Sequence, residues 1–163
     1  LSKLENQEMI LDKTEYRLDE QIRKCILMLE NKWSAKNIDF DMDLPRQIYY
    51  GSAPLLEQVW TNLIDNGIKH SPAGSSIRIS INETPEGLTV SISDDGAGMT
   101  EEVQKHIFEK FYQGDTAHKA EGNGLGLALV KRIIDLCKGS IEVKSSPGKG
   151  TTFITYLPKE YKK

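Results

Sequence analysis

Cysteine and histidine are scarce in this 163-residue sequence, which has two cysteines and three histidines. None of these residues has the paired spacing of a zinc site, so the small zinc-binding classes of domain are excluded. Cys25 and Cys137 fall on the apolar faces of predicted helices. We therefore expect two core thiols rather than a disulfide, which fits a reducing compartment.

Long apolar runs are also missing. No stretch approaches the roughly 20 apolar residues that a membrane-spanning helix requires, and no signal peptide is visible. The net charge is −3, so the chain lacks the basic surface of a nucleic-acid-binding protein, and no nucleic-acid partner is expected. Hydrophobic residues make up 38% of the chain and charged residues 28%, which predicts one soluble globular domain with its own core.

The N-terminal part of the chain predicts helices followed by two strands. Residues 1–14 carry leucines at heptad-like spacing, which is typical of the end of a longer helix from a coiled coil or bundle. Asp19 is expected to cap an amphipathic helix whose apolar face continues to Trp33. Strands are predicted from Ile38 to Pro45 and from Ile48 to Tyr50.

A second amphipathic helix is expected to begin at Ser52, with a buried apolar stripe. Asn62, Asn66 and Lys69 are spaced i, i+4 and i+7, so they share a polar face at the edge of that stripe. Such a face alone is usually plain solvated surface. The polar stripe therefore gains meaning only from other motifs in the chain.

Alternating apolar residues at 77–81 and 88–92, joined by turn residues 84–87, predict a β-hairpin. The hairpin leads directly into Asp94-Asp95-Gly96-Ala97-Gly98-Met99, and a short helix is expected from Thr100. This glycine pattern is not a dinucleotide-binding fingerprint, because the third glycine is missing and a hairpin precedes it. A Gly-Lys-Ser/Thr triplet is also absent, which excludes the P-loop class.

Three alternate glycines occur in Gly122-Asn123-Gly124-Leu125-Gly126-Leu127, after a polar stretch at 113–121. Glycines let the backbone turn and approach a ligand closely. Helical apolar spacing from Ala128 to Lys138 indicates that this loop opens a helix that Gly139 terminates. The N–H groups of a helix N-terminus suit a phosphate, although glycine-rich loops are often only linkers. Two final strands are predicted at 140–144 and 151–157.

The order of these motifs resembles the catalytic ATP-binding domain of sensor histidine kinases, in the superfamily that includes gyrase, Hsp90 and MutL. The resemblance covers residues 15–158; residues 1–14 then resemble the end of the dimerisation and phosphoacceptor helix with its linker, and 159–163 a polar tail. Five segments carry the resemblance, namely an asparagine box (Asn62–His70), a first glycine box (Asp94–Gly98), a phenylalanine box (Phe108–Tyr112), a second glycine box (Gly122–Leu127) and a glycine–threonine turn (Gly148–Phe153).

The resemblance implies an α/β two-layer sandwich, with a mixed, largely antiparallel sheet of about five strands under three main helices. A mobile lid at 113–121 would cover ATP. Phe108, Phe111 and Tyr112 are expected to pack in the core and anchor this lid rather than to stack on a base.

By the same resemblance, Asn66 is a Mg²⁺ ligand that Asn62 assists, and Lys69 contacts the phosphates of ATP. These three residues are the predicted catalytic set. Asp94 would accept a hydrogen bond from the amine of adenine, which guanine lacks at that position. The residues assigned to nucleotide binding are Asn62, Asn66, Lys69, Asp94, Gly96, Gly98, Met99, Phe111, Gly122, Asn123, Gly124, Leu125, Gly126, Leu127 and Thr152.

The sequence also departs from the family pattern. Gln113 stands where an arginine commonly follows the aromatic box, so Lys110 or Lys119 could supply that phosphate contact. Gly67 replaces a usual alanine, and His70 a common tyrosine. None of the three histidines is followed by an acidic residue, as a phosphoacceptor typically is. The acceptor is therefore expected upstream of Leu1.

The implied function is transfer of the γ-phosphate of ATP to that histidine, and from there to the receiver domain of a response regulator. The implied context is a homodimeric, membrane-anchored bacterial sensor kinase with this domain in the cytoplasm. Two other functions stay open: an ATP-hydrolysing member of the superfamily, and a non-catalytic module that senses nucleotide.

Overall fold

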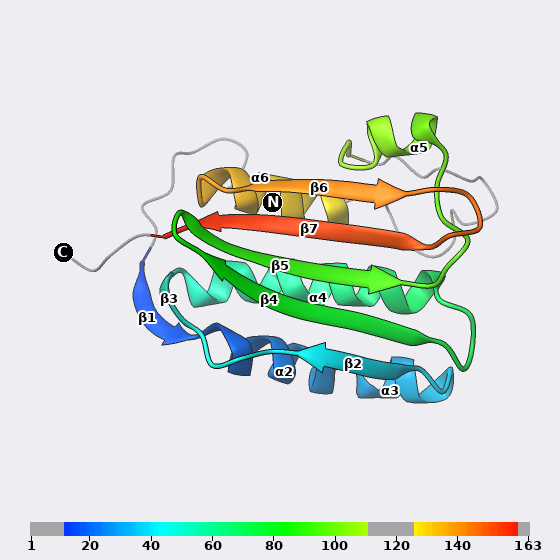
Figure 1. Ribbon diagram of the computed structural model, residues 1–163, viewed down its shortest axis with the longest axis horizontal. Helices are drawn as coiled ribbons and strands as arrows, with labels where there is room; N and C mark the ends of the chain where they lie inside the picture. Colours follow the sequence, from blue (N-terminus) through cyan, green and yellow to red (C-terminus); the bar gives the residue numbers. More distant parts are fainter. Residues whose placement is uncertain (1–11, 111–125, 160–163) are drawn as a thin grey trace.

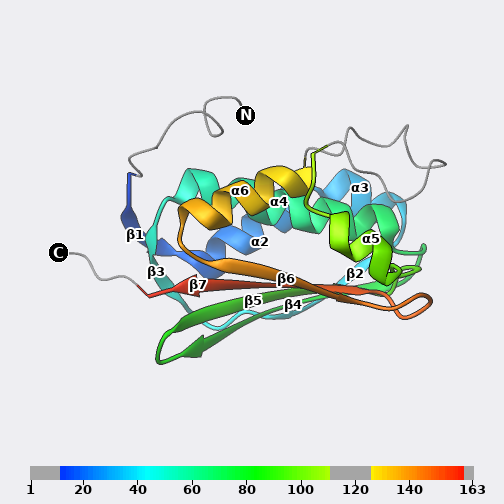
Figure 2. The same ribbon diagram turned by 90° about the horizontal axis from the view of Figure 1, so that it is seen from above.

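The computed structural model describes residues 12–110 and 126–159. A five-stranded sheet forms one layer. The helices form a second layer on one face of it, as Figures 1 and 2 show. This arrangement confirms the predicted two-layer α/β sandwich. The bounds of the helices are α2 (Leu18–Met28), α3 (Glu30–Ala35), α4 (Ala53–His70), α5 (Glu101–His106) and α6 (Gly126–Leu136).

The main sheet has the strand order β2-β4-β5-β7-β6. Strands β2 and β4 are parallel, and every other neighbouring pair is antiparallel, which confirms the predicted mixed, largely antiparallel sheet. The strands are β2 (Asp39–Asp43), β4 (Ser76–Thr84), β5 (Gly87–Asp94), β6 (Ser140–Ser145) and β7 (Thr151–Pro158).

The core lies between the sheet and the three long helices. Ile77, Ile79 and Ile81 of β4 are buried on the helix side, because successive side chains of a strand point to opposite faces. Trp60 and Leu56 of α4 are fully buried against this layer. Helix α4 therefore lies over the middle of the sheet, with α2 and α6 as its neighbours in the helical layer (Figure 2).

A small second sheet, absent from the sequence predictions, joins β1 (Thr14–Arg17) to β3 (Ile48–Gly51) in antiparallel register. The prediction of a helix through residue 14 is wrong at its end, since Thr14 lies in β1; residues 1–11 lie outside the described residues. Tyr16 packs edge-to-face on Tyr49 with ring centroids 6.2 Å apart. Such cross-strand aromatic pairs favour the strand over the helix.

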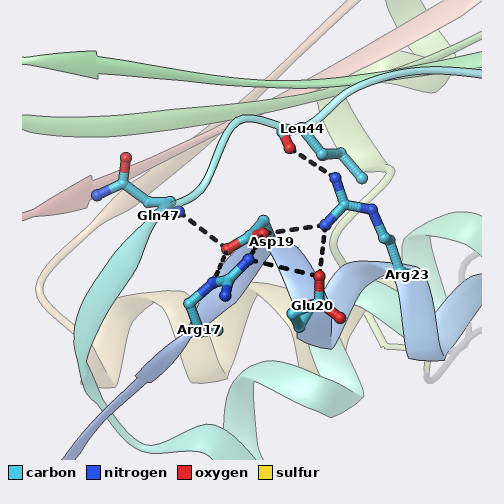
Figure 3. Close-up of polar contacts among 6 residues, drawn as sticks. All are labelled: Arg17, Asp19, Glu20, Arg23, Leu44 and Gln47. Carbon is cyan, nitrogen blue, oxygen red and sulfur yellow. Dashed lines mark hydrogen bonds and ion pairs between the residues drawn. The ribbon is translucent and has the colours of Figure 1, made fainter.

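The predicted capping role of Asp19 is also wrong, because α2 begins at Leu18 and Arg17 occupies the N-cap position. The Asp19 carboxylate accepts hydrogen bonds from Arg17 Nε at 2.9 Å, Arg23 Nη1 at 2.9 Å and the backbone N–H of Gln47 at 2.9 Å (Figure 3). These ion pairs hold the pKa of Asp19 well below its usual range, with Arg17 the largest contribution. Asp19 thus ties three segments together instead of capping one.

The predicted helix to Trp33 is interrupted at Leu29, which separates α2 from α3. The indole N–H of Trp33 donates to the carbonyl of Ile26 at 2.8 Å, and the backbone N–H of Leu29 bonds to the same carbonyl at 3.1 Å. This tight turn satisfies a carbonyl that the end of α2 leaves open.

Helix α6 ends earlier than predicted, at Leu136, and the residue with left-handed backbone is Lys138 (φ 60°) rather than Gly139. Both cysteines are thiols and not partners in a disulfide, as predicted; Cys25 is buried, and Cys137 is half-buried and packs on the core. In the described ranges 12–110 and 126–159, no helix is long and apolar enough to cross a membrane.

Candidate functional site

The polar edge of α4 is the first part of the site. Pro54 stands in the first turn, where a missing N–H costs nothing, and the buried stripe fixes the helix on the sheet. Asn62 and Asn66 are half-buried and Lys69 is exposed. The predicted polar stripe therefore lies at the boundary between core and solvent.

Asn62 contacts the beginning of α6. Its Nδ2 donates to the carbonyl of Gln58 at 2.7 Å. A Cβ atom added at Gly126 would lie only 2.9 Å from Asn62 Oδ1. The N-terminus of α6 thus lies against Asn62, and a side chain at position 126 would displace one of them. Leu127 follows as a half-buried residue packed on the core.

Asp94 ends β5 with its carboxylate buried, at 4% exposure. Oδ1 accepts the backbone N–H of Gly96 at 2.8 Å. Burial raises the pKa of Asp94, and the hydrogen bond from Gly96 partly opposes this. Across from it, a Cβ added at Gly67 of α4 would lie 4.0 Å from Oδ2. The structure therefore places the Asp94 carboxylate against the same helix that carries the asparagines.

The loop after Asp94 makes backbone contacts that only glycine allows. A Cβ at Gly96 would lie 2.3 Å from the carbonyl oxygen of His70, at the end of α4. Gly98 has a φ of +76°, and a Cβ there would lie 1.9 Å from the carbonyl oxygen of Ser146. The two glycines let the loop pack between α4 and the β6–β7 turn.

Thr152 does not join these residues. It pairs with Ser93 in the β5–β7 ladder, and its Oγ1 lies 2.7 Å from Ser93 Oγ on the face of the sheet away from the helices. Asp94 instead pairs with Thr151, which is buried. Strand alternation from the core residue Phe153 indicates the same inward position for Thr151, and the binding role of Thr152 stays a prediction.

Lys69 is held by a residue that sequence reasoning also missed. Its Nζ lies 3.5 Å from Asp65 Oδ2, and Asp65 Oδ1 accepts a hydrogen bond from Lys32 Nζ of α3 at 2.9 Å. The i, i+4 spacing of Asp65 and Lys69 is the signal that could have found this pair. Lys69 therefore shares Asp65 with a lysine from a neighbouring helix.

Met99, another predicted binding residue, is placed at the end of the Asp94 loop, where its backbone N–H donates to Ser145 Oγ at 2.8 Å; five other predicted residues are not described. Phe111, Gly122, Asn123, Gly124 and Leu125 lie outside the described residues, so their roles stay predictions. Phe108 of the same aromatic box is described, and it packs edge-to-face on Phe153 at 6.2 Å between ring centroids. This contact confirms the predicted packing role for Phe108.

The oxygen chemistry of this edge fits a magnesium nucleotide better than a metal held by protein alone. Among the described residues, no group of three or more histidine, cysteine or acidic side chains could hold a metal ion. Mg²⁺ in nucleotide sites takes few protein oxygens and keeps waters and phosphate oxygens. The half-buried amide of Asn66 matches that donor chemistry.

Comparison with known proteins gives the family. The sequence profile of the histidine kinase-, DNA gyrase B- and HSP90-like ATPases matches residues 51–161. The heme sensor protein HssS of Staphylococcus saprophyticus is 35% identical over 94% of this chain and 33% of its own length. The sensor-like histidine kinase SenX3 of Mycobacterium tuberculosis is 34% identical over 97% of this chain and 39% of its own length.

Solved structures agree with the sequence comparison. The catalytic domain of the histidine kinase ThkA superposes with a TM-score of 0.79 at 30% identity, over 91% of this chain and 96% of that one. The Acinetobacter baumannii histidine kinase AdeS gives a TM-score of 0.82 at 27% identity, over 98% of this chain and 74% of the AdeS chain. This chain spans less than half the length of the curated relatives that it matches. It belongs to the histidine kinase-, DNA gyrase B- and HSP90-like ATPase family, as an ATP-binding catalytic domain of the sensor histidine kinase type.

Proposed function

We propose that this chain binds Mg-ATP and donates its γ-phosphate to a histidine on a dimerisation and phosphoacceptor domain, for relay to a response regulator. One observation carries the proposal: the edge of α4 with Asn62 and Asn66 lies between the buried Asp94 carboxylate and the N-terminus of α6. A buried base acceptor, neutral oxygen ligands and a helix N-terminus are thereby arranged along one helix.

Asp94 recognises the base in this proposal. Its buried carboxylate is an acceptor, so it suits the exocyclic amine of adenine and repels the carbonyl that guanine presents there. The hydrogen bond from Gly96 fixes Oδ1, which leaves Oδ2 on the side of Gly67 for the ligand. Discrimination between the two purines follows from this geometry.

Asn66, Asn62 and Lys69 position the phosphates. Phosphoryl transfer requires mainly alignment and neutralisation of charge, and Mg²⁺, when bound, would supply most of that neutralisation. Asn66 offers a neutral oxygen to the ion, and Lys69 offers a point charge to the phosphates. The amide of Asn62, fixed by Gln58, packs against the start of α6 and holds that helix end near the phosphates.

A transfer assay tests the proposal. The chain, mixed with γ-labelled Mg-ATP and a separately purified histidine phosphoacceptor domain, should label that domain with acid-labile phosphate. Asn66→Ala should abolish most of the label, whereas Asn82→Ala, a matched change on the exposed face of β4, should not. Labelling of equal strength with Asn66→Ala would overturn the assignment of Asn66.

The wider setting is part of the same proposal. The curated relatives named above are sensor proteins that are two to three times longer than this chain. We place this domain on the cytoplasmic side of a membrane-anchored, homodimeric bacterial kinase whose own phosphoacceptor domain and response regulator are its partners.

A further inference from the structure

Ser145, the last residue of β6, uses its whole hydrogen-bonding capacity inside the protein. Its hydroxyl donates to the carbonyl of Gly150 at 2.7 Å and accepts the backbone N–H of Met99 at 2.8 Å. The Oγ1 of Thr151 lies 2.9 Å away and completes the set. A hydroxyl has one proton and two lone pairs, so all three positions are in use.

Gln104 of α5 binds the backbone carbonyl of Ser145 and also the loop residue Met99. Its Nε2 donates to the carbonyl of Met99 at 2.9 Å and to the carbonyl of Ser145 at 2.9 Å. The backbone N–H and carbonyl of Met99 are therefore both bonded to side chains, one from β6 and one from α5. Met99 closes the loop that begins at Asp94.

The β6–β7 turn supports the rest of this loop. The backbone N–H of Gly148 bonds to the carbonyl of Ala97 at 2.5 Å. A Cβ at Gly150, where φ is +74°, would lie 2.1 Å from the carbonyl oxygen of Asp94. The turn thus touches the loop at both of its ends, and Ser145 stands at the turn's entrance.

We infer that Ser145 and Gln104 are positioning residues for nucleotide recognition, which fix the loop Asp94–Met99 and couple it to α5. This inference rests on the proposed function, because it assigns to the loop the task of presenting Asp94 to adenine. Without the two bonds to Met99, the loop can relax away from the β6–β7 turn. The Asp94 carboxylate then loses its fixed direction, and the base-dependent part of binding is lost while phosphate contacts persist.

The experiment is a comparison of Mg-ATP and Mg-GTP binding by calorimetry. Ser145→Ala should weaken Mg-ATP about tenfold, because the loop loses its hydrogen bond at Met99 and the turn loses the two bonds that Ser145 makes to Gly150 and Thr151. Mg-GTP, which gains nothing from Asp94, should weaken less than about threefold. Ser146→Ala is the matched control, since that neighbouring side chain is exposed, and it should leave both affinities unchanged.

Two further variants separate positioning from simple destabilisation. Gln104→Leu should lower the preference for ATP over GTP, as Ser145→Ala does. Ser145→Thr keeps the hydroxyl, so it should keep the preference of the unmutated chain. Asp94→Asn is the reference for full loss of preference. If Ser145→Ala does not fold, the preference ratio of Gln104→Leu decides.

The outcomes are distinguishable. An unmutated chain that binds ATP and GTP equally would overturn the proposed adenine site itself. An unmutated chain that prefers ATP, together with folded Ser145→Ala and Gln104→Leu variants that keep the full preference, would overturn this inference and leave the proposed function standing.

Discussion

At the scale of single residues, the glycines differ in what a methyl group would meet. At Gly96 and Gly98 an added Cβ would lie within 2.3 Å of a backbone carbonyl oxygen, so a side chain there must displace the loop. At Gly67, inside α4, the nearest atom to an added Cβ is Ile77 Cδ1 at 3.4 Å. A methyl group therefore fits at this position and not at the other two.

We expect Gly67→Ala to raise the free energy of unfolding by about 0.5–1 kcal/mol, because glycine inside a helix is less favourable than alanine by that amount. Urea denaturation measures the change. Gly98→Ala is the contrasting variant, and it should destabilise the protein and weaken ATP binding together. A destabilising effect of Gly67→Ala would show that the space beside Ile77 is smaller than the structure indicates.

At the scale of elements, α4 carries an acidic residue next to Lys69, the lysine that we propose contacts the phosphates. Asp65 attracts Lys69 and adds a negative charge near the expected triphosphate. Asp65→Asn should therefore tighten Mg-ATP binding by about twofold at low salt, since exposed i, i+4 pairs contribute only about 0.3–0.5 kcal/mol. The gain should shrink as salt rises, because exposed charges are screened.

Calorimetry at low and high ionic strength tests this, with Asp135→Asn as control. Asp135 pairs with Lys131 at 2.8 Å in the same i, i+4 geometry on α6, at its exposed surface. Weaker binding by Asp65→Asn would mean that Asp65 orients Lys69 toward the phosphates instead of holding it back.

Asp19 joins three parts of the fold, namely β1, α2 and the segment before β3 (Figure 3). Asp19→Ala should lower the free energy of unfolding by about 1–3 kcal/mol, because the buried N–H of Gln47 loses its acceptor. Asp19→Asn should cost less, since its amide oxygen can still accept that bond. Urea denaturation of both variants gives the ranking, and an equal cost would exclude the Gln47 contact as the cause.

The pH dependence of this cluster has a definite sign. The pKa of Asp19 is depressed in the folded chain, so the unfolded chain binds more protons as pH falls. The stability difference between the unmutated protein and Asp19→Asn should be constant above about pH 5 and should decrease below about pH 4. A constant difference down to about pH 3 would show that the ion pairs contribute nothing measurable.

At the scale of the whole molecule, the kinase and hydrolase alternatives differ in whether the side chain at position 62 can act as a general base. By resemblance, the ATPases of the superfamily carry a glutamate four residues before the metal-binding asparagine, where it activates water. Here Asn62 cannot take a proton, and its Nδ2 is bonded to Gln58. Because a general base typically contributes about 10²–10⁴-fold, the chain should release phosphate far more slowly than about 1 s⁻¹.

A steady-state phosphate-release assay checks this expectation. Asn62→Glu should raise the rate, whereas Asn82→Glu on β4 should not. Turnover of the unmutated chain near about 1 s⁻¹ would favour the hydrolase alternative instead.

The sequence predicted those parts of the molecule that are encoded locally. Alternation predicted the β4–β5 hairpin, helical spacing predicted α4 and α6, and the order of five motifs predicted the fold and the family. Features that depend on distant partners were missed. Asp19 looked like a cap because its partner Gln47 lies 28 residues away, and the break at Leu29 depends on the Trp33 indole. The register that pairs Thr151, and not Thr152, with Asp94 depends on the partner strand, so the binding role of Thr152 stays a prediction.

The pairing of β1 with β3 also sets how much chain ahead of α2 can be released without unfolding the main sheet. The ladder has four residue pairs, from Thr14 with Gly51 to Arg17 with Ile48, and the Asp19 ion pairs anchor its far end. Tension applied ahead of Thr14 would peel the strand one pair at a time and stop at that anchor. Because an extended residue spans about 3.3 Å, four released residues would add roughly 13 Å of tether while the nucleotide site stays folded. Amide hydrogen exchange at Glu15 and Tyr16, compared with exchange in β5, measures how readily the β1–β3 ladder opens.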